Sequence, residues 1–282
     1  MTIGLVQYEL QSLNTREDFW NQINNHVKSA QEQGVKLLVF PEYVTGNLLA
    51  LCPVLTHEEA CQFLHEQTEE YVQTFASISR ETGMIIQAGT HIVQDNGQFY
   101  NTAFLFFPDG RLETQRKVHL TPEERRAWKL SPGEEFKVFD TEFGRVAILI
   151  CYDVEFPEAG RIVADKGAEI ILCPSYTDAA AGFHRVKNCS QARAVENQLY
   201  VAMCGIIGEV SGVEQIDLGY SQGGLFAPCD RPFPPDGILA EGKVNERGVV
   251  VGQADLTLLK ENREQGNVAP YWDRRPEVYN KA

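Results

Sequence analysis

The sequence is short of positive charge: 25 lysines and arginines stand against 39 aspartates and glutamates, so the net charge is −14. Nucleic acids and anionic membranes attract basic surfaces, and we therefore expect neither as a partner. The chain has no apolar run near the ~18 residues that a membrane span needs. Its start lacks a basic region followed by a long apolar one, so we expect a soluble, cytoplasmic protein.

An even set of cysteines is also missing. The seven cysteines cannot all pair with one another, and we expect reduced thiols. Internal repeats and low-complexity segments are absent too. The 282 residues are enough to bury a sizeable core, and nothing in the sequence forces a division into two domains.

Hydrophobic periodicity predicts alternating strands and helices. The expected strands are 2–8, 35–40, 84–89, 98–108, 111–117, 137–141, 146–150, 170–174, 200–205 and 248–255, and the expected helices are 15–32, 57–82, 156–166 and 183–197. Residues 121–135 and 208–224 are predicted to be loops. Because several strands are apolar throughout, the pattern indicates a layered α/β domain with helices on both faces of stacked sheets.

The segment around Cys151 is the most informative one. Val146 to Ile150 is an unbroken apolar run, the chain turns polar after Cys151, and Pro157 favours a helix start with Ile162 on its buried stripe. The thiol is thus predicted on a strand-to-helix turn near free backbone N–H groups, where an attacking sulfur and an oxyanion could both be served. The alternative is a small buried hydrophobic residue.

Two charged residues end other predicted strands in the same sense. Glu42 follows the strand that ends at Phe40, and its carboxylate could accept the thiol proton. We expect this strand and the one before Cys151 to lie side by side. Lys117 closes residues 111–117, and its ammonium would stabilise negative charge on an attacked oxygen. The alternative for each is a surface salt bridge or a solvated charge.

Six short motifs, in order along residues 1 to about 256, resemble the nitrilase superfamily of carbon–nitrogen hydrolases, in its amidase-like branch. They are Phe40-Pro-Glu42, Arg116-Lys117-Val-His-Leu, Cys151-Tyr-Asp153 with Phe156-Pro-Glu158, residues 191–197, Gly219-Tyr-Ser221 and residues 248–255. The resemblance implies an αββα four-layer sandwich and a Glu42-Lys117-Cys151 triad with no metal or organic cofactor.

The resemblance also implies roles for neighbouring residues. Glu124 would position the substrate or Lys117, and the backbone N–H of Tyr152 would join Lys117 in holding the oxyanion. Cys151 would form a thioester, ammonia or an amine would leave, and Glu42 would then activate water. Members generally pair through helices beside the active-site face, so we expect a homodimer or a higher homo-oligomer.

We expect a catalytic domain over residues 1–256 and a C-terminal tail over 257–282. The tail either packs on a partner subunit or clasps the surface of its own chain. Within the domain, Tyr176 ends another strand and is predicted to contact the substrate, with plain loop packing as the alternative.

Glu155 departs from the superfamily pattern, in which many members carry arginine at this position. This departure suggests a substrate that is neutral or basic near that point. A structural ion pair between Glu155 and Arg161 explains it equally well.

Three other patterns are interpreted as having no chemical role. Residues 219–223 match the G-x-S-x-G elbow of serine hydrolases, but a strand and not a helix is predicted after them. His57, Cys61 and His65 share a helix face that could hold zinc, although burial explains them better. Asn188 starts a glycosylation sequon on a predicted helix.

The leading hypothesis is a thiol amidase acting on a small linear amide. Nitrile or N-carbamoyl hydrolysis on the same triad, acyl transfer to an amine, and a catalytically silent scaffold or binding protein are the alternatives.

Overall fold

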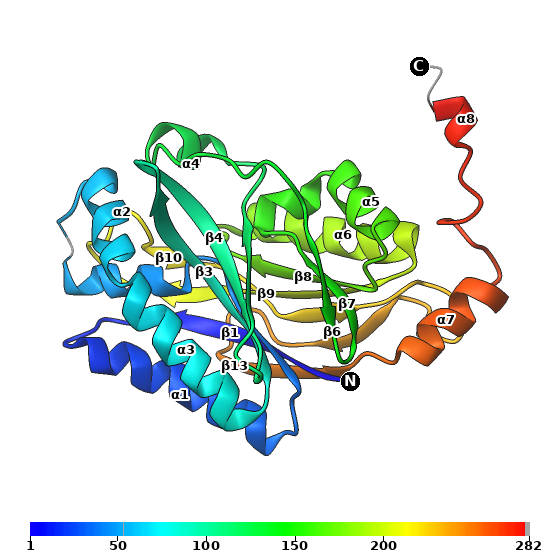
Figure 1. The fold of residues 1–282 in the computed structure, drawn as a ribbon, viewed down its shortest axis with the longest axis horizontal. Helices are drawn as coiled ribbons and strands as arrows, with labels where there is room; N and C mark the ends of the chain where they lie inside the picture. Colours follow the sequence, from blue (N-terminus) through cyan, green and yellow to red (C-terminus); the bar gives the residue numbers. More distant parts are fainter. Residues whose placement is uncertain (53, 280–282) are drawn as a thin grey trace.

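The computed structural model describes residues 1–52 and 54–279, which form two packed layers of strands flanked by helices (Figure 1). The strands are β1 (Thr2–Leu10), β2 (Leu37–Phe40), β3 (Ile85–Asp95), β4 (Gln98–Phe106), β5 (Leu112–Arg116), β6 (Val138–Thr141), β7 (Gly144–Ile148), β8 (Ile170–Ser175), β9 (Tyr200–Glu209), β10 (Leu218–Gly219), β11 (Gly224–Phe226), β12 (Ile238–Glu241) and β13 (Gly248–Gln253).

The helices surround this sheet. They are α1 (Arg16–Glu32), α2 (His57–Glu66), α3 (Thr68–Thr82), α4 (Pro122–Arg126), α5 (Pro157–Asp165), α6 (Ala180–Asn197), α7 (Leu256–Gln265) and α8 (Pro276–Tyr279), with two 3₁₀ segments, η1 (Val44–Leu51) and η2 (Cys151–Glu155).

The sheet has two wings, β5-β4-β3-β2-β1 and β9-β8-β7-β6, which join where β1 pairs with β9. The hydrogen-bonded order is β5-β4-β3-β2-β1-β9-β8-β7-β6. Pairing is parallel from β3 through β2 to β1 and from β7 through β8 to β9, while antiparallel hairpins form the two edges. The wings meet where β1 pairs with β9, and β13 adds an antiparallel strand beside β1. The carboxyl ends of β2, β7 and β8 are therefore available to build one site.

Alternating side chains separate two cores. In β2, Leu37 and Val39 face a core that also holds Ile148 from the other wing, so this core lies between the sheets. Leu38 and Phe40 face the opposite way, into a core shared with α1 and α3. On the second wing, α6 packs against β9 and α5 packs against α6. The layers run helix, sheet, sheet, helix, and the predicted αββα sandwich is confirmed.

The structure corrects four local predictions. The predicted loop 208–224 contains β10 and the end of β9. Residues 57–82 form two helices, because α2 ends at Glu66 and α3 begins after Gln67. The predicted loop 121–135 contains α4, whose start has a capping box made by Thr121 and Glu124. Ile162 does not join the buried stripe of α5 but is 42% exposed.

The C-terminal segment begins with α7, which buries Leu259 and Asn262. After α7 the chain passes α5, where the Tyr271 hydroxyl donates to Asp165 Oδ1 at 2.9 Å and Arg274 pairs with the same oxygen at 3.0 Å. It then extends to α8, and Trp272 in this stretch is 64% exposed (Figure 1). Residues 280–282 of the predicted tail lie outside the described residues, and the division at residue 256 stays a prediction. None of the described helices has both the length and the apolar character that a membrane crossing requires.

Candidate active site

The three residues of the predicted triad come from the ends of three strands. Glu42 follows β2, Lys117 follows β5, and Cys151 begins η2 just after β7. One expectation was wrong: β2 and β7 do not lie side by side, because β1, β9 and β8 separate them along the sheet. The two strands belong to different wings, so Glu42 and Cys151 meet across the sandwich and not along one sheet edge.

The backbone adopts an uncommon conformation at Cys151 and at the residue after Glu42. Cys151 has a φ of 46° and Tyr43, directly after Glu42, has a φ of 54°. Non-glycine residues rarely adopt this left-handed region, and such residues are often found at functional sites. Because Cys151 starts a 3₁₀ turn, the N–H of Tyr152 belongs to the first turn, where backbone donors have no partner within the helix. The predicted strand-to-helix turn is confirmed, and Pro157 is the first residue of α5.

Lys117 lies between two carboxylates. Its Nζ is 2.7 Å from Glu42 Oε1 and 2.8 Å from Glu124 Oε2. The side chains of Lys117 and Glu42 are only 2% and 1% exposed, and that of Glu124 is 4% exposed. A surface salt bridge, the alternative considered for Glu42 and Lys117, is therefore excluded for both.

Neutral groups complete the hydrogen bonds of the two carboxylates. Asn101 Nδ2 donates to Glu42 Oε1 at 2.8 Å and to Glu124 Oε1 at 3.1 Å. The hydroxyl of Tyr43 donates to Glu124 Oε1 at 2.7 Å, and the backbone N–H of Thr121 donates to Glu124 Oε2 at 2.8 Å. These donors compensate for the burial of charge.

Tyr176 connects the sulfur to this network through its backbone. The Cys151 Sγ donates to the Tyr176 carbonyl at 3.4 Å, and the Tyr176 N–H donates to Glu42 Oε2 at 3.0 Å. Its ring packs edge-on against Tyr43, with 6.2 Å between the ring centroids. Tyr176 therefore lines the site, while its predicted contact with substrate stays a prediction.

Asp153 ties the lysine segment to the cysteine segment. Its carboxylate is fully buried and accepts the backbone N–H of His119 at 2.7 Å and that of Ile150 at 3.2 Å. The backbone N–H of Val118, next to Lys117, donates to the same carboxylate at 3.4 Å. One side chain thus fixes the residues after Lys117 and the residue before Cys151.

Burial and charge give the two glutamates different pKa values. Burial and the neighbouring Glu124 raise the pKa of Glu42 to about 7, although the charge of Lys117 and the nearby Cys151 thiol act in the opposite direction. Burial also acts to raise the pKa of Glu124, but Lys117 and the donors around it hold that pKa below its ordinary value. Glu124 is therefore the ionised partner of the lysine, and Glu42 titrates near neutral pH.

The pKa values of the other two groups follow from the same surroundings. Burial acts to lower the pKa of Lys117, but Glu124 and Glu42 together raise it well above its ordinary value. Burial and Glu42 raise the pKa of the Cys151 thiol, and Lys117 only partly offsets this. The resting site thus contains a charged lysine and a protonated thiol.

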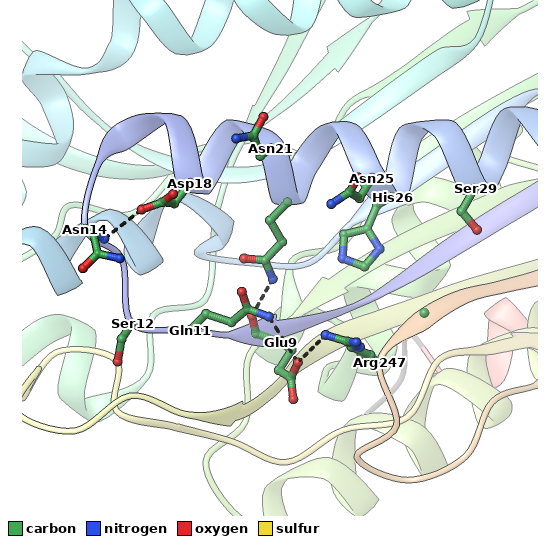
Figure 2. Close-up of a pocket in the computed structure, with 12 residues that line it drawn as sticks. Glu9, Gln11, Ser12, Asn14, Asp18, Asn21, Asn25, His26, Ser29 and Arg247 are labelled. Carbon is green, nitrogen blue, oxygen red and sulfur yellow. Dashed lines mark hydrogen bonds and ion pairs between the residues drawn. The ribbon is translucent and has the colours of Figure 1, made fainter.

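The site is shielded from solvent, since Cys151 is only 5% exposed. A polar hollow of about 630 Å³ between α1 and the ends of β1 and β13 is open to solvent, but it lies elsewhere (Figure 2). Its lining includes Glu9, His26 and Arg247 and none of the three triad residues.

The other motifs take part in different contacts. His65 Nδ1 accepts the backbone N–H of Gln94, and Cys61 is buried with its thiol 3.8 Å from a carbonyl oxygen. Among residues 1–52 and 54–279, no three or more histidines, cysteines or acids are grouped to hold a metal. Residues 219–223 lead into strand β11, as predicted, and Asn188 is on α6.

Glu155 forms its ion pair with Arg185 and not with Arg161, the partner considered from the sequence. Its Oε2 lies 3.2 Å from Arg185 Nε, whereas Arg161 donates to the backbone oxygen of Glu196. The ion-pair explanation is therefore correct in kind and wrong in its partner.

Comparison with known proteins adds to this geometry. The family model described as carbon-nitrogen hydrolase matches residues 2–261. The chain belongs to the carbon-nitrogen hydrolase family. The nitrilase-superfamily resemblance of the sequence is thus confirmed.

Three proteins illustrate what this carbon-nitrogen hydrolase is similar to. It is 42% identical over 98% of its length to "Probable hydrolase YhcX" of Bacillus subtilis, but spans only 54% of that protein. It is 30% identical to "Omega-amidase NIT2-B" of Xenopus laevis, covering 93% of this chain and 91% of that one. A mutant amidase from Nesterenkonia sp. AN1, solved with acrylamide added to its active-site cysteine, is 25% identical with a TM-score of 0.76, covering 100% and 99% of the two chains.

Three further residues of the site have little or no signal in the sequence of this hydrolase. Asn101 is the polar member of an inward-facing series in β4 that continues with Ala103 and Leu105, and an amide in such a series is a detectable signal. Tyr43 follows Glu42 but has no motif of its own. Asp153 lies in the cysteine motif without indicating which amides it binds.

Proposed function

We propose that this protein is an amidase that hydrolyses a small linear amide through a thioester on Cys151. The observation that carries the proposal is the buried network in which Lys117 bridges Glu42 and Glu124 beside the sulfur. Such a network supplies a base, a fixed cation and a nucleophile, which are the three requirements of nucleophilic catalysis on a carbonyl.

The proposed chemistry has two halves. Glu42 takes the thiol proton as the sulfur attacks the amide carbon, and the Lys117 ammonium and the Tyr152 N–H hold the resulting oxyanion. Glu42 then gives its proton to the leaving nitrogen, and the carbon–nitrogen bond breaks to leave a thioester and ammonia or an amine. In the second half Glu42 takes a proton from water, the hydroxide attacks the thioester, and the carboxylic acid leaves as the proton returns to sulfur.

The pKa values support this division of roles. A general base works best when its pKa lies near the operating pH, and burial with Glu124 raises the pKa of Glu42 to about 7. Glu124, whose pKa is lowered mainly by Lys117 against the effect of burial, keeps the lysine charged. Two carboxylates whose surroundings separate their pKa values are a recurrent sign of acid–base assignment.

Several neighbouring functions use the same groups. Nitrile or N-carbamoyl hydrolysis would proceed on the same triad, and acyl transfer would replace water with an amine. We also propose a cytoplasmic homo-oligomer, which sedimentation of the purified protein would test. A silent scaffold is the alternative from a different class, and the buried charged network argues against it because burying charges without a use lowers stability.

The test combines labelling with turnover. Acrylamide, which adds to the active-site cysteine of the Nesterenkonia amidase, should label Cys151 stoichiometrically and leave the other six cysteines slower. A panel of amides, ureides and nitriles is then screened for ammonia release, with Cys151→Ala as the folded inactive control. Equal labelling of all seven cysteines, or turnover in the Cys151→Ala variant, would contradict the proposal; faster hydroxamate formation than hydrolysis in hydroxylamine would indicate acyl transfer.

A further inference from the structure

Asn101 occupies the middle of the charged network without belonging to the triad. It comes from β4 and is 1% exposed. Its Nδ2 is the donor that reaches both carboxylates, at 2.8 Å to Glu42 Oε1 and 3.1 Å to Glu124 Oε1. The arrangement closes a ring, because Lys117 Nζ reaches the same two oxygens at 2.7 Å and 2.9 Å.

The orientation of the Asn101 amide follows from its neighbours. If the amide were turned over, its oxygen would face two carboxylate oxygens and repel both. In the observed orientation the Oδ1 atom is buried and has no hydrogen-bond partner among the described residues. Leaving an acceptor unpaired is unfavourable, so the two carboxylates determine how this side chain lies.

The hydrogen bonds of Glu42 indicate how the Asn101 amide affects this carboxylate. Oε1 of Glu42 accepts from Lys117 and from Asn101, which fills both of its lone-pair directions. Within the described part of the chain, Oε2 has a single donor, the Tyr176 N–H, at 3.0 Å. The oxygen with a free lone pair is therefore Oε2, and Tyr176 also contacts Cys151 through its carbonyl.

We propose that Asn101 is a positioning residue of the hydrolase: by occupying Glu42 Oε1 and spanning to Glu124, it directs proton transfer from Cys151 to Glu42 Oε2 and stabilises the ionised base. This inference rests on the proposed function, since it assigns Glu42 as the base. A neutral donor suits this place, because a second cation would compete with Lys117 for the same carboxylates.

The experiment measures the rate at which acrylamide alkylates Cys151 between pH 5.5 and 9, with mass spectrometry locating the label. In the wild-type protein the rate should rise with a midpoint near 7, the pKa to which burial raises Glu42. Asn101→Leu keeps the size but removes both hydrogen bonds, and should move the midpoint up by about one pH unit. At pH 6 alkylation would then be about tenfold slower, while the rates at pH 9 would converge.

Two further variants separate positioning from a structural role. Thr102→Val changes the next residue on β4, which is buried and faces the other side of the strand, and should leave the profile unchanged. Asn101→Asp keeps the shape and adds a third acid, so its midpoint should rise further than that of Asn101→Leu, and it serves as the test if the leucine variant does not fold.

The outcomes have distinct meanings. A profile superimposable on the wild type, or one lowered by a single factor with its midpoint unmoved, would overturn the proposal that Asn101 stabilises the ionised Glu42. Failure of the wild-type protein to label Cys151 ahead of the other cysteines would instead overturn the proposed amidase function.

Discussion

Replacing Glu124 by glutamine should move the working pH of Glu42 downward. The two carboxylates share Lys117 Nζ and Asn101 Nδ2, each within about 3 Å, so their charges lie about 5 Å apart. At an effective dielectric constant of about 20, two unit charges at that separation repel by about 3 kcal/mol, or about two pH units. Glu124→Gln keeps the size and an oxygen acceptor but removes this repulsion, so the pKa of Glu42 should fall from about 7 toward the ordinary range of a carboxylic acid.

The assay is the pH dependence of Cys151 alkylation by acrylamide, which requires no knowledge of the natural substrate. Because the base is active when ionised, the midpoint of the rate curve should move to lower pH in Glu124→Gln and to higher pH in Asn101→Leu. Thermal unfolding of both variants checks that the fold is intact. A midpoint that stays in place or rises in Glu124→Gln would refute the charge coupling between the glutamates.

Three further predictions concern the lysine, a buried histidine and the rim of the site. Lys117→Ala should lower kcat more than it raises KM, because the oxyanion forms only in the transition state; wild-type kinetics would remove this role. Burial lowers the pKa of His91 to about 3, so below pH 6.5 the unfolded chain binds the proton first and stability falls by about 1.4 kcal/mol per pH unit. His91→Asn should therefore flatten the decrease of Tm between pH 6 and 4, and an unchanged slope would contradict this reasoning. Burial raises the pKa of Tyr176, and the charges of Asp217, Glu123 and Asp178 act in the same direction. Ammonium-bearing amides should therefore react faster than carboxylated ones, and changing both Asp217 and Asp178 to asparagine should reduce that preference. Faster turnover of carboxylated amides by the wild-type protein would count against it.

Most of the fold follows from local patterns in the sequence. The two-residue alternation in Leu37 to Phe40 places side chains in two different cores, and a strand apolar on both faces is typical of a layer between helices and another sheet. Pro157 starts α5 as its fixed φ favours. These are short-range effects that depend on neighbouring residues alone.

The errors have long-range causes. The sequence does not reveal that β1 and β9 join the wings, so it could not show that Glu42 reaches Cys151 across the sandwich. The helix boundary at Gln67 carries no signal in the sequence, because neither glycine nor proline marks it. Asn101 and Tyr43 join the site through hydrogen bonds to residues 23 to 81 positions away, and only the folded chain brings these partners together.

The carboxylate of Asp153 has a consequence for how a substrate enters. Since it binds the amides that follow Lys117 and the amide that precedes Cys151, the ammonium and the sulfur are parts of one rigid floor. Widening the entrance by separating them would break several hydrogen bonds at once. Admission of a substrate therefore depends on side chains above this floor, such as the ring of Tyr176 that packs against Tyr43, and substitutions of that ring should change which molecules enter without altering the floor.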